Sequence, residues 1–192
     1  MTEYDFTLRF DVSGVDADSD ERVELLAVHG CDDALIGTGI PGRIALEFTR
    51  EAPSPEHAVL SAITDVKTAL PQATLIEATP DFVGYTEVAE IVGKSRQNMR
   101  KLLLARGATG PIPVHEGPST IWHLAPVLTW LRDEKQYEID SDSIDLARTT
   151  MHVNMAAMQV GCGSVIDERI TRLLSGTGDV ASSGRKERRA RV

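Results

Sequence analysis

The stretch EVAEIVGKSRQNMRKL, Glu87–Leu102, decides the fold of the middle of this chain. Ala89 is small enough for two helices to cross closely, and Gly93 can adopt the positive φ that ends a helix in a tight turn. Ser95 can then cap the next helix through its hydroxyl group. The sequence therefore predicts two short helices joined by a tight turn. They are Thr86–Val92 and Ser95 to about Arg106.

The second of these helices has two different faces. Met99, Leu102 and Leu103 recur at the i, i+3 and i+4 spacing that buries one face against the first helix. The opposite side has the basic and amide side chains of Gln97, Arg100 and Lys101, and Arg96 and Asn98 lie on its flanks. Arg can pair with guanine, and Gln or Asn with adenine, whereas Lys94 and Lys101 suit phosphate contacts. This combination favours a DNA-recognition helix over the alternative, a structural helix with a solvated basic face.

A hairpin and a third helix are predicted further along the chain. The segments Pro111–His115 and Ser119–His123 flank a turn at Glu116–Pro118. A helix with Pro126 near its first turn then extends to about Lys135. The middle of the chain is therefore predicted to contain three helices and one hairpin.

With this hairpin and Trp122, the stretch VGYTEVAEIVGKSRQNMRKLLLARG (Val83–Gly107) resembles winged helix-turn-helix domains of the MerR/excisionase type. The resemblance covers residues 82–135, under a third of the chain. It implies that the second helix enters the major groove of double-stranded DNA and that the hairpin, or wing, touches the backbone or minor groove. The residues implicated are Lys94, Ser95, Arg96, Gln97, Asn98, Arg100 and Lys101, with His115, Ser119 and Thr120 from the wing. The wing departs from a strongly basic one, because it contains Glu116 and neither Arg nor Lys.

The first eighty residues alternate between strand and helix patterns. Phe6 and Leu8 recur at the period of a half-buried strand, as do the apolar residues of Arg43–Arg50. Ser54 can cap a later helix. The order of strand, helix, strand, strand, helix and strand is that of a ferredoxin-like βαββαβ sandwich. We therefore expect an α+β chain: the sandwich at 1–80, the winged helix-turn-helix at 82–135 and a helical segment at 141–175.

The net charge of −9 is distributed unevenly along the chain. Residues 1–81 contain 16 acids and 5 bases (−11), residues 82–135 contain 5 acids and 7 bases (+2), and residues 136–192 contain 8 of each (0). No acid occurs from Ile91 to His115. Since phosphate binding depends on a local patch, the acidic total is only a weak objection to DNA binding.

The C-terminal part is predicted to contain a long helix, Ser143–Val160, and a shorter one, Val165–Leu174. The long helix is apolar on two sides, so it must be covered twice, either within one chain or partly by a second copy. One stripe suggests a homodimer interface and consists of Ile144, Met151, Met155 and Met158. Residues 176–192 are polar and end in the basic RKERRAR, so we expect a disordered tail that either contacts phosphates or only aids solubility.

Several other classes of protein are disfavoured. The chain contains no apolar run of roughly 18 residues and begins without a secretory signal pattern, which predicts a cytoplasmic protein with no membrane partner. Its two cysteines, Cys31 and Cys162, suit a reducing compartment. GTGIPG at 37–42 precedes an alternating strand pattern, so a hairpin loop is favoured over a nucleotide-binding fingerprint. The cluster His29, Cys31, Asp32 and Asp33 lacks a second set with zinc-ligand spacing, so we expect no metal.

These observations favour a sequence-specific DNA-binding regulator that acts as a dimeric repressor. Its acidic N-terminal domain would serve as a sensor, partner-binding or assembly module. The alternative is a protein-interaction module, such as an antitoxin or adaptor, whose acidic domain binds a basic protein. An enzyme is the least favoured class, because no catalytic constellation is present, and no cofactor is expected.

Overall fold

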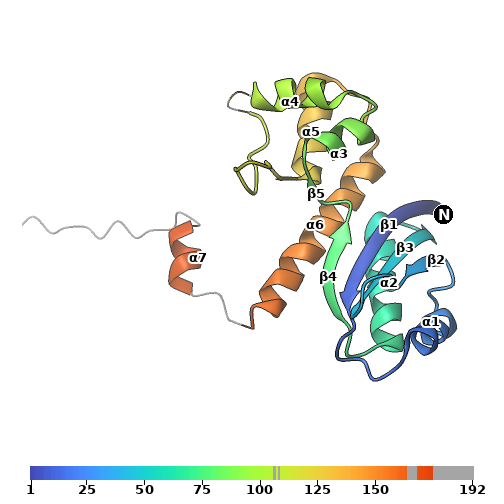
Figure 1. Cartoon of the computed structure of the whole chain (residues 1–192). Coiled ribbons are helices and arrows are strands. Elements are labelled where there is room, and N and C mark those ends of the chain that lie inside the picture. Colours follow the sequence, from blue (N-terminus) through green and yellow to red (C-terminus); the bar gives the residue numbers. More distant parts are fainter. Residues whose placement is uncertain (106, 108, 164–167, 175–192) are drawn as a thin grey trace, which may run out of the picture. The chain divides into compact units, whose positions relative to one another are not determined.

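The structure, a computed structural model of mixed α+β class, describes residues 1–105, 107, 109–163 and 168–174 (Figure 1). The chain divides into two compact units, Met1–Met158 and Gln159–Val192. The elements of the first unit are β1 (Thr2–Asp11), α1 (Ser19–Val28), β2 (Ala34–Gly37), β3 (Arg43–Ala52), α2 (Pro55–Ala69), β4 (Thr74–Thr79), β5 (Phe82–Val83), α3 (Tyr85–Ile91), α4 (Arg96–Leu104), β6 (Trp122–His123), α5 (Leu124–Lys135) and most of α6 (Ser141–Gly161). The second unit contains the end of α6 and α7 (Glu168–Leu174).

Strands β1 to β4 form one sheet in the order β2-β3-β1-β4, and every pairing is antiparallel. The alternation predicted for β1 and β3 buries one side of both strands, where Phe6 stacks on Phe48 with ring centroids 5.1 Å apart. Residues of α1 and α2, including Leu26 and Val66, complete this first apolar cluster. The predicted order of the elements is confirmed up to β4, and 37–42 joins β2 to β3 as a hairpin loop. Ser54 caps α2 as predicted, since its hydroxyl oxygen accepts a hydrogen bond from the His57 N–H.

A second apolar cluster lies among α3, α4, α5, β6 and the start of α6. Its largest fully buried members include Trp122, Met99 and Leu128. Helix α4 ends at Leu104; Arg106, where we placed its end, lies outside the described residues.

The predicted hairpin is corrected by the structure. β6 pairs with β5, which precedes α3, and the segment 111–115 contributes a single bridge between His115 and Ile121. Pro111 and Pro113 explain this result, because proline has no N–H with which to extend a ladder.

Helix α6 contributes to both apolar clusters. Ile144 is buried in the second cluster and Leu146 in the first. The two apolar sides predicted for this helix are therefore covered, over its first turns, within one chain. The shorter helix α7 begins at Glu168; the predicted start at Val165 and the predicted tail at 176–192 lie outside the described residues.

Polar side chains of α6 form hydrogen bonds with the end of β4 and with the residues that follow it. The side-chain oxygen of Asn154 accepts from the Ala78 N–H at 2.7 Å, and its amide nitrogen donates to the Ala78 carbonyl at 2.8 Å. Because β4 is an edge strand, this side chain occupies hydrogen-bonding groups that a neighbouring strand would otherwise use. The same amide nitrogen donates to Asp81 at 2.8 Å, and Thr150 donates to the Pro80 carbonyl.

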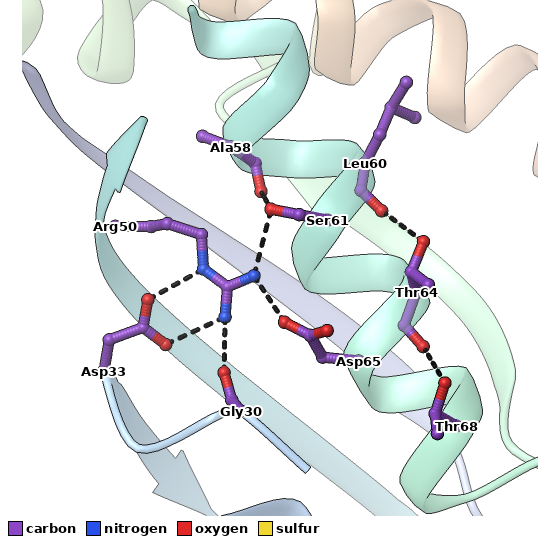
Figure 2. Close-up of polar contacts among 9 residues, drawn as sticks. All are labelled: Gly30, Asp33, Arg50, Ala58, Leu60, Ser61, Thr64, Asp65 and Thr68. Atoms are coloured by element: carbon purple, nitrogen blue, oxygen red, sulfur yellow. Dashed lines mark hydrogen bonds and ion pairs between the residues drawn. The ribbon is translucent and has the colours of Figure 1, made fainter. Parts of the chain in front are cut away.

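A buried arginine of β3, Arg50, connects α2 with the loop between α1 and β2 (Figure 2). The Arg50 guanidinium donates to both carboxylate oxygens of Asp33, at 2.7 and 3.0 Å, and to Asp65 at 2.7 Å. It also donates to the Ser61 hydroxyl at 3.1 Å and the Gly30 carbonyl at 2.7 Å. We call these five residues the Arg50 cluster. Burial opposes the charge, but the hydrogen bonds to Asp33 and Asp65 outweigh it and raise the pKa of Arg50.

Candidate nucleic-acid interface

The turn between α3 and α4 has the geometry that the sequence predicts. Gly93 has a φ of +62°, and the Lys94 N–H donates to the Ala89 carbonyl at 2.8 Å. The Ser95 hydroxyl accepts from the Asn98 N–H at 3.2 Å, so it caps α4. The glycine and the cap together set the direction in which α4 leaves the turn.

The packing of α4 determines which of its sides faces outward. Met99 and Leu103 are fully buried in the second cluster, where Val88 and Ala89 of α3 also lie. Leu102 is partly buried against the same cluster. The remaining side chains must therefore project away from the core.

All the residues predicted to bind DNA in the turn and on α4 are exposed. They are Lys94, Ser95, Arg96, Gln97, Asn98, Arg100 and Lys101. None of the cations among them forms a salt bridge with another described residue. The structure thus leaves all seven residues accessible to solvent, and we call this set the α4 surface.

The position of the cations along α4 is informative. Lys94 precedes the cap and Arg96 is the first residue of the helix, whose N-terminal end has a partial positive charge. A cation at this end destabilises an isolated helix by about 0.3–1 kcal/mol, so the placement is unfavourable for the helix alone. An anion at the same place would interact favourably with both the cations and the helix end.

Lys94 has a neighbour that the sequence does not indicate. Its ammonium nitrogen lies 5.9 Å from the centroid of the Tyr137 ring, within the range of a cation–π contact. A phosphate contact by Lys94 would therefore compete with this ring.

The residues predicted to form a wing differ more in exposure than those of the α4 surface. His115 and Ser119 are exposed, and Thr120 is partly buried. The His115 ring lies against Gly117, since a Cβ at that glycine would be 2.6 Å from Nε2. The His115 ring is therefore folded over the turn at Glu116–Pro118.

The four residues predicted to form a dimer surface separate into two groups. Ile144 is 1% exposed and belongs to the core of its own chain, so its assignment to a dimer surface is wrong. Met151 is partly buried, whereas Met155 and Met158 are each 55% exposed. Of the four residues, Met155 and Met158 are therefore the most accessible to a partner, and Met151 is accessible in part.

The cluster considered as a metal site has other contacts. Asp33 is hydrogen-bonded to Arg50, and Cys31 is buried, which raises the pKa of its thiol to about 11. Among the described residues, no group of three or more metal-ligating side chains gathers. The arrangement is that of a structural loop.

The sequence does not indicate the buried contacts of Asp81. Its side chain is fully buried; one carboxylate oxygen lies 2.7 Å from His123 Nδ1 and the other accepts from Asn154. These residues are far apart in the chain, so no local pattern reveals them. The only signal is an acid between Pro80 and the apolar Phe82.

Comparisons of the chain with protein-family models, curated proteins and solved structures gave no match. In the part of the chain that the structure describes, no helix is both long and apolar enough to span a bilayer.

Proposed function

We propose that this protein is a sequence-specific, double-stranded DNA-binding transcriptional regulator, and that α4 is its recognition helix. The observation that carries the proposal is the α4 surface, where the cations and amides are exposed while Met99 and Leu103 of the same helix are buried. Arg96 and Arg100 would contact guanine, and Gln97 and Asn98 adenine, in the major groove. Lys101 would contact a phosphate.

The finer fold assignments belong to the same proposal. The strand order β2-β3-β1-β4, with its two helices, supports a ferredoxin-like sandwich for residues 1–80. The β5–β6 pair beside α3, α4 and α5 supports a winged helix-turn-helix at 82–135. The sandwich would act as a sensor, partner-binding or assembly module of a cytoplasmic regulator.

We also propose that the protein acts as a homodimer, as a repressor would on a palindromic operator. The exposed Met155 and Met158 support this assignment, because flexible apolar side chains pack well against a partner. The partly buried Met151 would extend the same surface. A sedimentation mass of a single chain at micromolar concentration would contradict the dimer.

The test is selection from random duplex DNA, followed by sequencing, with the wild type and Arg96→Ala/Arg100→Ala. We expect a palindromic motif that the double variant loses. Each lost base contact is worth about 1–3 kcal/mol, or roughly five-fold to more than a hundred-fold in affinity. The matched control, Arg9→Ala/Arg43→Ala, removes two exposed cations from the sheet and should recover the same motif. Absence of enrichment by the wild type at low salt would contradict the proposal.

A second candidate, a protein-interaction module, is favoured by one observation. The side of the sheet that faces away from α1 and α2 is acidic and exposed, with Glu3, Asp5, Glu47 and Glu51 on β1 and β3. This surface would bind a basic protein, and DNA binding would be auxiliary. If the selection fails, a basic partner of this surface becomes the leading hypothesis.

A further inference from the structure

Strand β2 leaves one edge of the four-stranded sheet open. The order β2-β3-β1-β4 makes β2 and β4 the two edge strands (Figure 1). At β4, Asn154 occupies the N–H and the carbonyl of Ala78, and the register with β1 shifts after Arg9. β2 pairs with β3 without interruption and contains neither a charge nor a proline. Only its length of four residues protects its free edge.

The hydrogen bonds between β2 and β3 show which backbone groups face this free edge. The Asp33 carbonyl accepts from the Thr49 N–H at 3.2 Å. Residues of an antiparallel ladder alternate between facing the partner strand and facing away, so Leu35 also faces β3. The backbone groups of Ala34 and Ile36 therefore face away from the sheet.

Four backbone groups at this edge have no hydrogen-bond partner in the part of the chain that the structure describes. The Ala34 N–H donates to the Cys31 carbonyl at 3.3 Å, which leaves the Ala34 carbonyl without a donor. The N–H and the carbonyl of Ile36 and the N–H of Thr38 complete the set. We call these four the free edge groups. An unpaired edge of this kind is a template for a further strand.

The free edge groups of two copies of the chain are complementary to each other. With a two-fold axis at Ile36, the N–H of each Ile36 donates to the Ile36 carbonyl of the other copy. Each Thr38 N–H then donates to the Ala34 carbonyl of the other copy. This register therefore uses all four free edge groups of both copies.

The side chains fit the same register. Leu35 is 72% exposed and would lie opposite Gly37 of the second copy, where only Ala45 lies within 4 Å of an added Cβ. Leu35 can therefore cover that glycine on the outward side of the sheet. On the other side, Ile36 packs against the first cluster and would meet its own copy, which extends the apolar layer.

Charge and area both favour a second copy of the chain as the occupant of this edge. Residues 34–42 contain no charge, although residues 1–81 contain 16 acids and 5 bases, so two copies meet here without opposing like charges. Ile40, 60% exposed beside β2, adds apolar surface. An interface of about 15 residues a side would bury roughly 1,000 Å² in total, the lower limit for a specific dimer, so we expect a micromolar Kd.

We propose that β2 is an interface through which two copies of this chain join their sheets, with a two-fold axis at Ile36. The pairing makes one continuous sheet from two four-stranded sheets, and it buries Leu35 of each copy over Gly37 of the other. The contact is separate from the exposed methionines of α6 and is independent of DNA binding.

Directed disulfide formation tests the register in the full chain. Leu35→Cys and Gly37→Cys, each with Cys162→Ser, are mixed and mildly oxidised; Cys31 is buried and is not expected to react. In the proposed register the Cα atoms of residues 35 and 37 are about 4.5 Å apart, whereas two copies of residue 35 are about 7–8 Å apart, beyond the reach of a disulfide. We expect the mixed disulfide in at least about ten-fold excess over either symmetric one. Symmetric disulfides as abundant as the mixed one, or no disulfide at all, would overturn the proposal.

Amide hydrogen exchange, measured by mass spectrometry, tests the backbone contact in the unmodified strand. Exchange at Ile36 and Thr38 should slow about ten-fold between about 10 μM and 1 mM chain, because pairing removes both N–H groups from water. Leu35→Lys should abolish this dependence on concentration, since a charge on an edge strand opposes pairing. The matched control, Leu60→Lys, replaces an exposed leucine of α2 and should retain it. Exchange that is independent of concentration in the wild type, or equal loss of the dependence in both variants, would overturn the proposal.

A variant of α6 separates the β2 contact from the exposed methionines. Met155→Glu/Met158→Glu removes two exposed apolar side chains of α6 and should leave the protection of Ile36 unchanged. Loss of this protection would assign the association to α6 and overturn the proposal. None of these measurements contains DNA, so failure of the proposed DNA binding would not affect their outcome.

Discussion

Replacing Arg50 with Met would test whether the Arg50 cluster stabilises the packing of α1 and α2 on the four-stranded sheet. The guanidinium makes five hydrogen bonds, to Asp33, Asp65, Ser61 and Gly30. It lies over the Phe48 ring, 4.9 Å from the centroid. Met has a similar apolar stem but no donor, so the substitution removes the polar contacts and keeps much of the packing.

The expected loss of stability follows from what remains after the substitution. Arg50 is 7% exposed, whereas the Asp33 and Asp65 side chains are 30% and 31% exposed. Breaking a buried ion pair costs about 3–5 kcal/mol, and the two carboxylates can recover part of their hydration, so we expect about 3 kcal/mol. For a chain of this size the loss corresponds to a fall in Tm of about 6–12 °C. Arg50→Lys keeps the charge but loses the planar fork, so we expect roughly half the effect.

Thermal and urea unfolding followed by circular dichroism would measure these changes. Arg9→Met is the matched control, because its salt bridge to Glu77 joins side chains that are 48% and 31% exposed, and it should cost less than about 1 kcal/mol. Adding Asp33→Asn and Asp65→Asn to Arg50→Met should restore part of the stability, since no uncompensated charge remains. If the free energy of unfolding of Arg50→Met is within about 0.5 kcal/mol of the wild-type value, the reasoning is refuted.

Three further predictions concern single residues. Gly93→Ala should lower the free energy of unfolding in urea by about 1 kcal/mol, because its φ of +62° strains an L residue although no atom lies within 4 Å of the added Cβ; an unchanged midpoint would contradict this. Hydrogen bonds from Ser143 lower the pKa of Asp140, so the stability that Asp140 contributes is present above the pKa of the unfolded state and is lost as pH falls. Asp140→Asn should therefore reduce the loss of stability between about pH 5 and pH 2. Identical acid-unfolding profiles of the variant and the wild type would count against this prediction. Burial raises the pKa of the Cys31 thiol to about 11, so Ellman's reagent at neutral pH should modify only the exposed Cys162 until the chain is unfolded; two rapidly reacting thiols in the native chain would refute this.

Helices α3 and α4 and the turn between them were predictable because their signals are local. Gly93, Ser95 and Met99 lie within seven residues, and each acts on the adjoining backbone or on the next turn of helix. The alternation in β1 and β3 was predictable for the same reason. Binding of DNA by the α4 surface is a prediction of a different kind, because exposure and charge permit it without identifying the ligand.

The contacts between distant segments were not predictable from the sequence. β5 and β6 have two residues each, too few to display a period, and they are about forty residues apart. Arg50 lies at one of the alternate positions of β3 whose side chains point into the core, where a charge is unfavourable without partners. Its partners Asp33 and Asp65 come from other parts of the chain and are brought close only by the fold. Val28 of α1 is 81% exposed, whereas Leu26 is the residue of that helix that is buried in the core.

The junction after β4 explains why α6 has polar residues among its buried positions. Asp81 is a buried carboxylate without a described Lys or Arg partner, so its position depends on His123 and Asn154. Its carbonyl oxygen accepts from Leu124 N at 2.7 Å, which ties the same residue to the start of α5. Since a buried polar group left without partners costs about 1–3 kcal/mol, displacing α6 would expose several unpaired groups at once. The polar side chains of α6 therefore fasten the first cluster to the second.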